Sequence, residues 1–442
     1  MTATEASLRS KHARYVLTPW SVQGASDRPV IVRGSRSALF DEDGKRYIDL
    51  SSGLVAVNLG HAHPALIEAI ARQAARICYV SPALYNDERA EFAAELSALA
   101  PWEEGARTFF TTGGGEANED AVKVARHLTG RTKVLAAYRS FHGSAPGAGT
   151  LTGENRRWPN EPGPPGVVHF VAPFPYRSPF STEDPATETA RALEHLELVL
   201  TYEDPNRIAA VLLEPIVGTN GVGVYPEGYL AGVRERCERH GILLVFDEVM
   251  TGFGRTGEAF AAKRLGVTPD IITFAKGATS AYVPLGGVLL REGLAEAFDE
   301  RVFPTGHTFS GHPLAMAAGR AALRAYQDEA LFARAREIEG WLHAGLHGIR
   351  ERIPVVGDVR GLGAFFGVEL VRDRKTKEPI APWQGPAMGP LPVLLRRMLD
   401  LGVYVFGRYN ILLIAPPLVI TQEELREALQ VLEQALDEFQ AM

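Results

Sequence analysis

The sequence predicts an α/β protein organised around a doubly wound, mostly parallel sheet, and three short apolar runs support this fold class. Each run leads directly to an ionisable residue. The runs are Ile208–Leu213 before Glu214, Ile242–Phe246 before Asp247, and Ile271–Ala275 before Lys276. Short runs rich in valine, isoleucine and leucine are typical of strands buried on both faces of a parallel sheet.

The spacing of the runs also fits parallel strands. Glu214 and Asp247 are 33 positions apart, and Asp247 and Lys276 are 29 apart, which allows one strand–helix–strand crossover each. Because parallel strands in open α/β sheets end at a common rim where ligands bind, we expect the three side chains in one crevice. A lysine can form a Schiff base, and a carboxylate can hold a pyridine nitrogen protonated. The pattern therefore indicates a pyridoxal-phosphate site.

The first third of the chain predicts an arm followed by the first elements of both domains. Residues 1–37, with Pro19 and Trp20, predict an extended arm. The expected elements that follow are a hairpin at 38–49 around a Glu-Asp-Gly turn, a helix at 64–77 opened by proline, a strand at 108–112, a helix after Gly113–Gly115, and a strand at 134–137. Residues 143–190 are rich in glycine and proline without clear periodicity, so we expect this segment to lie over a site or an interface.

The rest of the chain alternates strands and helices and then changes in character. Residues 193–291 alternate as in a doubly wound domain, and residues 313–350 read as almost wholly helical. Two short strands are expected within 355–370, one at 411–415, and a last helix after the capping box formed by Thr421 and Glu424. We predict an N-terminal arm and part of a small domain at 1–60, a large cofactor-binding domain at 61–330, and the C-terminal part of the small α+β domain at 331–442.

Composition excludes several classes of protein. The 442 residues carry a net charge of −7, which argues against a nucleic-acid or anionic-membrane surface. The two cysteines, Cys78 and Cys237, fit a reducing compartment. No signal peptide or membrane-spanning run is recognisable. We therefore expect a cytoplasmic protein.

Lys276 and Asp247 are the strongest candidates for chemistry. Lys276 alone among the lysines follows a buried-strand run and precedes a glycine, and desolvation there would lower its pKa and free the amine for attack on an aldehyde. The alternative is a strand-end lysine that reaches water. Asp247 could face a pyridinium nitrogen, with Val249 two residues on covering a ring face. The alternative for Asp247 is a helix N-cap.

Two further clusters fit a phosphorylated, planar cofactor. Gly113–Gly115 stand between a strand and a helix, where backbone N–H groups and the helix N-terminus favour an anion; a flexible turn is the alternative. Phe141, before His142 and Gly143, could stack on the ring, although a core phenylalanine is equally compatible. No metal site is expected, because His61, His63, His307 and His312 lack partners at ligand spacing. Gly218–Gly223 predicts a turn and not a dinucleotide-binding motif.

The order and spacing of these motifs resemble one family. The relevant stretches run from Phe246 to Gly257, Thr273 to Gly277, His307 to Pro313, Glu214 to Ile216 and Ser52 to Asn58. From about Ala38 to the C-terminus the chain resembles a class III aminotransferase of the ω-amino-acid/amine group. That resemblance implies a fold-type-I pyridoxal-phosphate enzyme, with a large doubly wound domain and a small domain formed by both termini.

The resemblance also implies residue roles. Lys276 would carry the cofactor as a Schiff base and move the proton, and Asp247 would bind the pyridine nitrogen. The other expected cofactor contacts are Glu214 in the polar network, Phe141 with His142 beside it, Val249 on the opposite ring face, backbone groups of Gly114 and Gly115 on the phosphate, and Thr308 from a neighbouring subunit. Such a shared site implies a homodimer, which could pair into a tetramer.

The expected substrate-binding residues are Trp20, Val55 and Arg408. Val55 stands where amine-accepting relatives often have tryptophan, which suggests a roomier pocket. The family's mobile arginine would fall at Phe406, and Arg408 lies two residues later on the same face of a strand; a surface arginine is the alternative. Two other departures are Gly113–Gly115 in place of Ser-Gly-Ser, which removes a hydroxyl from the phosphate site, and Phe141 in place of tyrosine.

The expected function is a ping-pong transaminase that moves nitrogen from a primary amine or ω-amino acid to pyruvate or a similar 2-oxo acid. One alternative is a pyridoxal-phosphate aminomutase of the glutamate-1-semialdehyde type, which would convert a single substrate without added keto acid. A related decarboxylase and a non-catalytic cofactor-binding protein are further alternatives. Retention of Lys276 argues against the non-catalytic protein.

Overall fold

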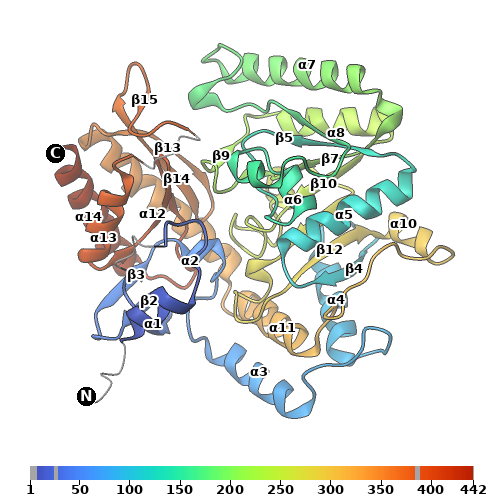
Figure 1. The fold of residues 1–442 in the computed structure, drawn as a ribbon, viewed down its shortest axis with the longest axis horizontal. Helices are drawn as coiled ribbons and strands as arrows, with labels where there is room; N and C mark the ends of the chain where they lie inside the picture. Colours follow the sequence, from blue (N-terminus) through green and yellow to red (C-terminus); the bar gives the residue numbers. More distant parts are fainter. Residues whose placement is uncertain (1–6, 24–27, 384–388, 442) are drawn as a thin grey trace.

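A computed structural model describes residues 7–23, 28–383 and 389–441 of the chain. Two units lie side by side (Figure 1). One contains the long central sheet and its helices, drawn from teal to yellow. The other combines the blue N-terminal strands with the orange and red C-terminal elements.

The elements of the first half of the chain are α1 (Leu8–Tyr15), β1 (Ile31–Ser35), β2 (Ala38–Asp41), β3 (Arg46–Asp49), α2 (Ser52–Val55), α3 (Pro64–Arg76), α4 (Asp87–Leu99), β4 (Ala106–Thr111), α5 (Gly114–Thr129), β5 (Lys133–Ala137), α6 (Pro146–Leu151), η1 (Asn155–Asn160), β6 (Val167–Phe170), η2 (Pro175–Arg177), α7 (Pro185–Glu203), η3 (Pro205–Arg207), β7 (Ile208–Leu213), β8 (Ile216–Val217) and β9 (Gly223–Val224).

The second half contains α8 (Tyr229–His240), β10 (Leu243–Asp247), α9 (Ala261–Leu265), β11 (Ile271–Phe274), η4 (Lys276–Ala278), β12 (Gly286–Arg291), α10 (Glu292–Ala295), η5 (Glu296–Phe298), α11 (Pro313–Asp328), α12 (Leu331–Arg352), β13 (Val356–Leu362), β14 (Phe365–Asp373), β15 (Glu378–Pro379), α13 (Leu391–Asp400), β16 (Val403–Tyr404), β17 (Phe406–Arg408), β18 (Ile411–Ile414) and α14 (Gln422–Gln440).

The central sheet has seven strands in the order β4-β12-β11-β10-β7-β5-β6. Strand β12 runs antiparallel to both of its neighbours, and the other adjacent strands are parallel. The three apolar runs form β7, β10 and β11, which are adjacent in the sheet. The predicted doubly wound, mixed and mostly parallel sheet is confirmed.

Burial on both faces explains why the central strands are continuously apolar. Along β10, Leu244 and Phe246 belong to one hydrophobic cluster, whereas Leu243 and Val245 belong to another. Because successive side chains of a strand point to opposite faces, the two clusters lie on opposite sides of the sheet. Helix α5 packs over one of these faces, against β7, β10, β11 and β12.

The second unit draws strands from both ends of the chain, as predicted. Its first sheet has the order β1-β2-β3-β16, in which the C-terminal strand β16 pairs in parallel with β3. Its second sheet has the order β13-β14-β18-β17, with β15 paired to β14. The predicted hairpin at 38–49 and the capping box of Thr421 and Glu424 are both present. Within the described ranges, no helix is both long and apolar enough to cross a bilayer.

The expectation for the N-terminal arm is wrong in part. The arm was expected to be extended, but its residues 8–15 form helix α1, capped by Ser7; residues 1–6 and 24–27 of the arm lie outside the described residues. The 143–190 segment, for which no element was predicted, contains α6, η1, the edge strand β6, η2 and the start of α7. Strand β6 pairs with β5, a nonlocal contact that local periodicity does not reveal.

The connection from β10 to β11 also differs from a simple helical crossover, since its helix α9 has only five residues. Buried Glu248 instead accepts hydrogen bonds from the backbone N–H groups of Ala261 and Ala262. Fully buried Arg255 donates to the carbonyls of Ala364 and Pro416 in the second unit. This loop therefore ties the two units together beside the ends of the central strands.

Candidate active site

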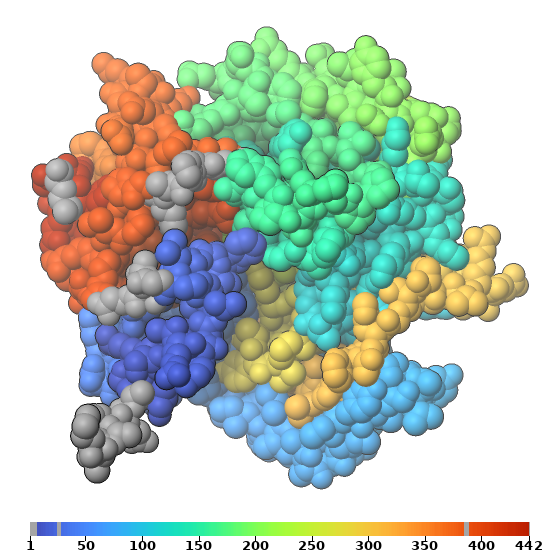
Figure 2. All heavy atoms as spheres, in the orientation of Figure 1, coloured from blue at the N-terminus to red at the C-terminus, as the bar shows by residue number. Residues whose placement is uncertain are grey.

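A cavity of about 370 Å³ lies where β7, β10 and β11 end. Its lining includes Glu214, Asp247 and Lys276, the three ionisable residues that follow the apolar runs. The start of α5 and the segment 141–143 contribute further walls. In Figure 2 the yellow surface near residue 280 is recessed between the blue N-terminal and teal segments. The predicted convergence on one crevice is confirmed.

Lys276 projects from the first residue of η4, directly after β11. Its φ of 45° lies in the left-handed region, which costs a non-glycine residue roughly 1–2 kcal/mol. Within the described part of the chain, Nζ makes no hydrogen bond or ion pair. Burial lowers the pKa of the Lys276 amine to about 8, although the charges of Asp247 and Glu214 oppose that shift. The amine is thus available to react at mildly alkaline pH.

Asp247 ends β10 and is held from three sides. Its Oδ2 lies 2.7 Å from His142 Nδ1 and accepts a 2.8 Å hydrogen bond from Asn118 Nδ2. Its Oδ1 accepts from the backbone N–H of Val249 at 3.0 Å. The alternative interpretation of Asp247 as a helix N-cap is wrong, because the next helix, α9, begins only at Ala261. The carboxylate is therefore fixed in orientation at the cavity wall.

Asn118 is a site residue whose role the sequence did not reveal. Its amide Nδ2 also donates to the carbonyl of His142, and its Oδ1 accepts from the Thr273 hydroxyl at 2.7 Å. Asn118 thereby links α5, the segment after β5, and strand β11. Asn118 lies in the first two turns of the helix that follows the glycine cluster, on the face toward the sheet. This position was the sequence feature that could have indicated a role in the site.

Glu214 is buried beside Asp247 and is also hydrogen-bonded to backbone. Its Oε1 accepts from the N–H of Phe141 at 2.9 Å, and its Oε2 accepts from the N–H of Gly218 at 2.7 Å. Burial raises the pKa of the Glu214 carboxyl to about 7, with His142 opposing and Asp247 reinforcing the shift. Glu214 therefore fixes the positions of Phe141 and of the β8–β9 turn. That turn spans residues 218–222, so the predicted turn at Gly218–Gly223 is present, with its last glycine pairing in β9.

The glycine cluster forms the N-terminus of α5, with Gly113 as its N-cap. A Cβ on Gly114 would lie 2.7 Å from a methyl carbon of Val249, so only glycine permits this close approach. A Cβ on Gly113 would meet no atom within 4 Å. Gly113–Gly115 all line the cavity, where free N–H groups of the first helical turn favour an anion.

Phe141 lines the cavity and packs against two residues outside it. The Arg156 guanidinium carbon lies 3.7 Å from the centroid of the Phe141 ring. Trp20, 62% exposed, makes an edge-on contact with Phe141 at a centroid separation of 6.5 Å. The expectation that the 143–190 segment lies over a site is confirmed at Gly143, which lines the cavity, and Arg156 of the same segment packs on Phe141. Arg156 itself was not identified from the sequence, because no local pattern distinguishes it.

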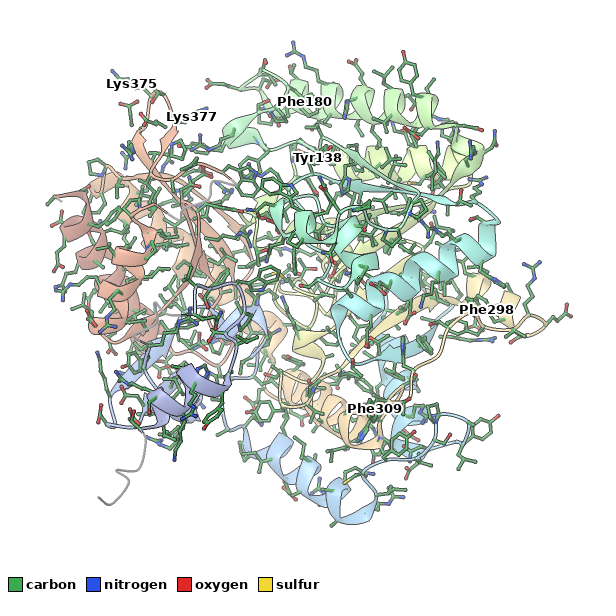
Figure 3. All side chains as sticks on the ribbon, in the orientation of Figure 1. Tyr138, Phe180, Phe298, Phe309, Lys375 and Lys377 are labelled. Carbon is green, nitrogen blue, oxygen red and sulfur yellow. The ribbon has the colours of Figure 1, made fainter. Side chains whose placement is uncertain are left out.

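The remaining predicted residues lie outside the cavity wall. Val55 is buried in an apolar cluster, and its neighbour Ala56 lines the cavity. Arg408 is on strand β17, with a 15% exposed side chain that is bonded to Glu154, so it is not a surface arginine. Thr308 is exposed in the loop before α11, next to Phe309 (Figure 3). Their roles stay predictions.

The cavity residues fit pyridoxal phosphate. A lysine amine that has no hydrogen-bond partner among the described residues, a fixed carboxylate and a glycine-lined helix N-terminus border one space. These groups match an aldehyde, a pyridine nitrogen and a phosphate respectively. His142 Nε2 is buried and, among the described residues, has no hydrogen-bond partner.

A family comparison, two solved structures and a curated relative all relate the chain to aminotransferases. Residues 22–436 match the family described as aminotransferase class-III. A solved taurine:2-oxoglutarate aminotransferase from Bifidobacterium kashiwanohense, in complex with PLP and glutamate, is 41% identical with a TM-score of 0.94 over 97% of each chain. A thermostable (S)-enantioselective omega-transaminase from Thermomicrobium roseum is 37% identical with a TM-score of 0.91 over 97% of each chain. The acetylornithine aminotransferase of Corynebacterium efficiens is 38% identical over 93% of each chain.

Proposed function

The chain belongs to the class III aminotransferase family, and from this membership we propose that it moves an amino group from a primary amine or ω-amino acid to pyruvate or a similar 2-oxo acid. It is a pyridoxal-phosphate-dependent aminotransferase. The name omega-transaminase of one similar structure supports the proposed donor class. The taurine enzyme is named for 2-oxoglutarate, so the choice of acceptor needs direct measurement.

One observation carries the proposal: the Lys276 amine, which has no partner in the part of the chain that the structure describes, and a hydrogen-bonded carboxylate line the same cavity. When bound, pyridoxal phosphate supplies an aldehyde carbon that takes up the amino group and a ring that withdraws electrons. We assign to Lys276 the attachment of the cofactor and the movement of the proton at the reacting carbon. Asp247 would keep the ring nitrogen protonated, while Asn118 and His142 hold Asp247 in place.

The other cofactor contacts follow from the cavity wall. Phe141 and Val249 would hold the ring between them, and Glu214 holds the backbone beside Phe141. The N–H groups of Gly114 and Gly115 would bind the phosphate. Because Gly114 leaves no room for a side chain against Val249, we propose that a glycine is needed here for the helix N-terminus and Val249 to border the same space.

We propose that the active unit is a homodimer in which Thr308 reaches the phosphate site of the partner subunit. Thr308 does not line the cavity of its own chain. Its loop is anchored to α5 through buried Asp120, which lies 2.6 Å from both Thr305 Oγ1 and His307 Nε2. Sedimentation velocity on the cofactor-loaded protein should give twice the mass of the 442-residue chain or more. A monomer that retains full activity would contradict the proposal.

A donor-by-acceptor assay tests the proposed reaction. Purified, cofactor-loaded protein is mixed with primary amines and ω-amino acids, each with pyruvate or 2-oxoglutarate, and the aminated product of the acceptor is measured. We expect turnover with at least one amine donor only when a 2-oxo acid is present. Conversion of a single amino compound without any keto acid would identify an aminomutase instead. Turnover restricted to 2-oxoglutarate would overturn the pyruvate part of the proposal.

A further inference from the structure

Lys276 stands at the start of a short turn whose backbone is strained. Residues 276–281, here called the lysine turn, include Lys276 at a φ of 45°, Ser280 at 51° and Ala281 at 61°, all in the left-handed region. Such conformations are unfavourable for residues with a side chain, and they persist only where surrounding contacts hold them. The groups that hold the lysine turn therefore also set the direction of the Lys276 side chain.

Gly277, the second residue of the lysine turn, is enclosed by three other parts of the chain. Its carbonyl accepts a 2.8 Å hydrogen bond from the hydroxyl of Tyr326, a fully buried residue of α11. A Cβ on Gly277 would lie 2.6 Å from Asn58 Nδ2 and 2.8 Å from Phe253 Cβ. Helix α11, the segment around residue 58 and the loop after β10 thus confine the turn directly beside the lysine.

Asn58 is buried and connects the lysine turn to the loop after β10. Its Nδ2 donates to the Phe253 carbonyl at 2.9 Å, and its Oδ1 accepts from Arg255 Nη2 at 2.5 Å. The neighbouring N–H of Leu59 donates to the Ser280 hydroxyl, near the other end of the turn, at 2.9 Å. Residues 58 and 59 therefore hold the turn at two points, and Arg255 fixes the amide of Asn58.

Arg255 holds this position without a carboxylate partner. Its Nη1 donates to the carbonyls of Ala364 at 3.0 Å and Pro416 at 2.6 Å, and its Nη2 also donates to the Ser52 hydroxyl at 3.2 Å. Within the described ranges, no aspartate or glutamate pairs with this fully buried guanidinium. A buried charge is costly unless hydrogen bonds satisfy it, and here neutral oxygens do so. Arg255 is thus a buried cation that the proposed reaction does not itself use.

The charge of Arg255 also acts on the amine of Lys276. Burial lowers the pKa of that amine to about 8, against the charges of Asp247 and Glu214. The positive charges of Arg156 and Arg255 add to the lowering. Because a nearby cation disfavours a second positive charge, it favours the neutral amine. The neutral amine is the form that attacks an aldehyde.

We propose that Arg255, Asn58 and Tyr326 are positioning residues that hold the lysine turn so that the Lys276 amine enters the cavity in the orientation needed to attack the cofactor aldehyde. This inference rests on the proposed function, in which Lys276 carries the cofactor. The three positioning residues do not line the cavity, so they act through the backbone of Gly277. Because Arg255 is anchored on carbonyls of the second unit, the lysine turn is fixed relative to both units.

Attachment of pyridoxal phosphate measures this positioning without any donor or acceptor. The reaction joins the amine nitrogen to the aldehyde carbon and releases the aldehyde oxygen as water. Full-length protein freed of cofactor is mixed with pyridoxal phosphate, the second-order rate constant is followed by absorbance, and borohydride trapping locates the adduct. In Tyr326→Phe we expect a rate roughly two- to tenfold lower, the range for losing a neutral hydrogen bond. In Arg255→Gln we expect a loss of roughly tenfold to a hundredfold, the range for hydrogen bonds from a charged group.

The pH dependence of attachment separates a positioning role from a purely structural one. Arg255→Gln removes a nearby positive charge, so the Lys276 amine holds its proton more strongly and its pKa rises. Attachment should therefore reach half of its maximal rate at a higher pH than in wild type. Arg255→Lys keeps the charge and should keep the wild-type pH dependence, although it loses the planar fork. The other ionisable groups around the amine are the same in both variants: Asp247, Glu214, Arg156 and His142.

Two control variants match these substitutions elsewhere in the protein. Tyr47 is a buried tyrosine of β3 whose hydroxyl donates to Asp41 at 2.7 Å. Arg131 lies at the opposite end of the central strands and, like Arg255, donates to backbone carbonyls, those of Pro205, Ile208, His240 and Gly241. Arg131→Gln and Tyr47→Phe should lower the melting temperature but attach the cofactor at the wild-type rate.

The outcomes separate this inference from the proposed function. If Tyr326→Phe and Arg255→Gln attach the cofactor as fast as the two controls, the positioning residues are purely structural and the inference fails. It also fails for Arg255 if attachment in Arg255→Gln keeps the wild-type pH dependence. If Arg255→Gln does not fold, Tyr326→Phe decides alone, because it removes a single oxygen atom. If wild type attaches the cofactor at Lys276 but transfers no amino group to any 2-oxo acid, the proposed function fails and the attachment rates still decide the inference.

Discussion

Replacing Lys276 with alanine is expected to abolish aminotransferase turnover. In the proposed function the lysine provides both the covalent attachment of the cofactor and the proton carrier at the reacting carbon, and no other lysine lines the cavity among the described residues. Loss of a positioned acid–base group typically costs about 10²- to 10⁴-fold in rate. Because Lys276 combines two roles, we expect a loss at or beyond the upper end of that range. The measurement is the steady-state rate with saturating donor and acceptor.

The control is Lys263→Ala, which removes an exposed lysine of the nearby helix α9 and should leave the rate unchanged. Lys276→Ala should remain folded, since Lys276 Nζ makes no hydrogen bond with the described residues that would be lost. Addition of a small amine such as methylamine should restore part of the activity by supplying a proton acceptor. An alanine variant with near wild-type turnover would refute the role of Lys276.

Replacing Asp247 with asparagine is expected to retain the cofactor but reduce kcat by roughly 10²- to 10³-fold, the range for losing one electrostatic contact to the developing charge. Asparagine keeps the shape of the side chain and can still accept from the N–H of Val249. It loses the negative charge to which we assign the protonation of the ring nitrogen. The amide also places a donor where Oδ2 now accepts from Asn118. Stopped-flow absorbance with a saturating donor measures the slowed step directly.

Asp270→Asn provides a matched control for loss of a buried aspartate. Asp270 lies at the opposite end of β11 and pairs with Arg234 and Arg291 at 2.6 and 3.0 Å. Its substitution should lower the melting temperature, because it breaks two partly buried ion pairs, yet leave kcat close to wild type. If Asp247→Asn instead turns over at a near-normal rate, the carboxylate does not support the cofactor ring.

The core of the site could be predicted because it depends on local patterns. An apolar run followed by one ionisable residue marks both a buried strand and the side chain at its end, so Glu214, Asp247 and Lys276 were identifiable without any contact information. The adjacency of β7, β10 and β11 then follows from the parallel sheet. The capping box at Thr421 was predictable for the same reason, since its partner is three residues away.

The parts that could not be predicted depend on contacts between distant residues. Asn118 supports Asp247 across 129 positions of sequence, and Glu154 meets Arg408 across 254. Strand β6 exists because β5 offers an edge for parallel pairing, whereas its own sequence is short and flanked by glycine and proline. The sequence of helix α1 has no apolar stripe, and none of its side chains is buried. The contacts of Asn118, Glu154 and β6 are with residues distant in sequence, and the local sequence does not identify those residues.

The covalent attachment of the cofactor to Lys276 is tested most directly by reductive trapping. Holoenzyme is treated with borohydride, digested, and analysed by peptide mass spectrometry. The account predicts that the reduced pyridoxyl-phosphate adduct is found on the peptide that contains Lys276 and is absent from the Lys276→Ala protein. An adduct on a different lysine, or no adduct in active holoenzyme, would contradict it.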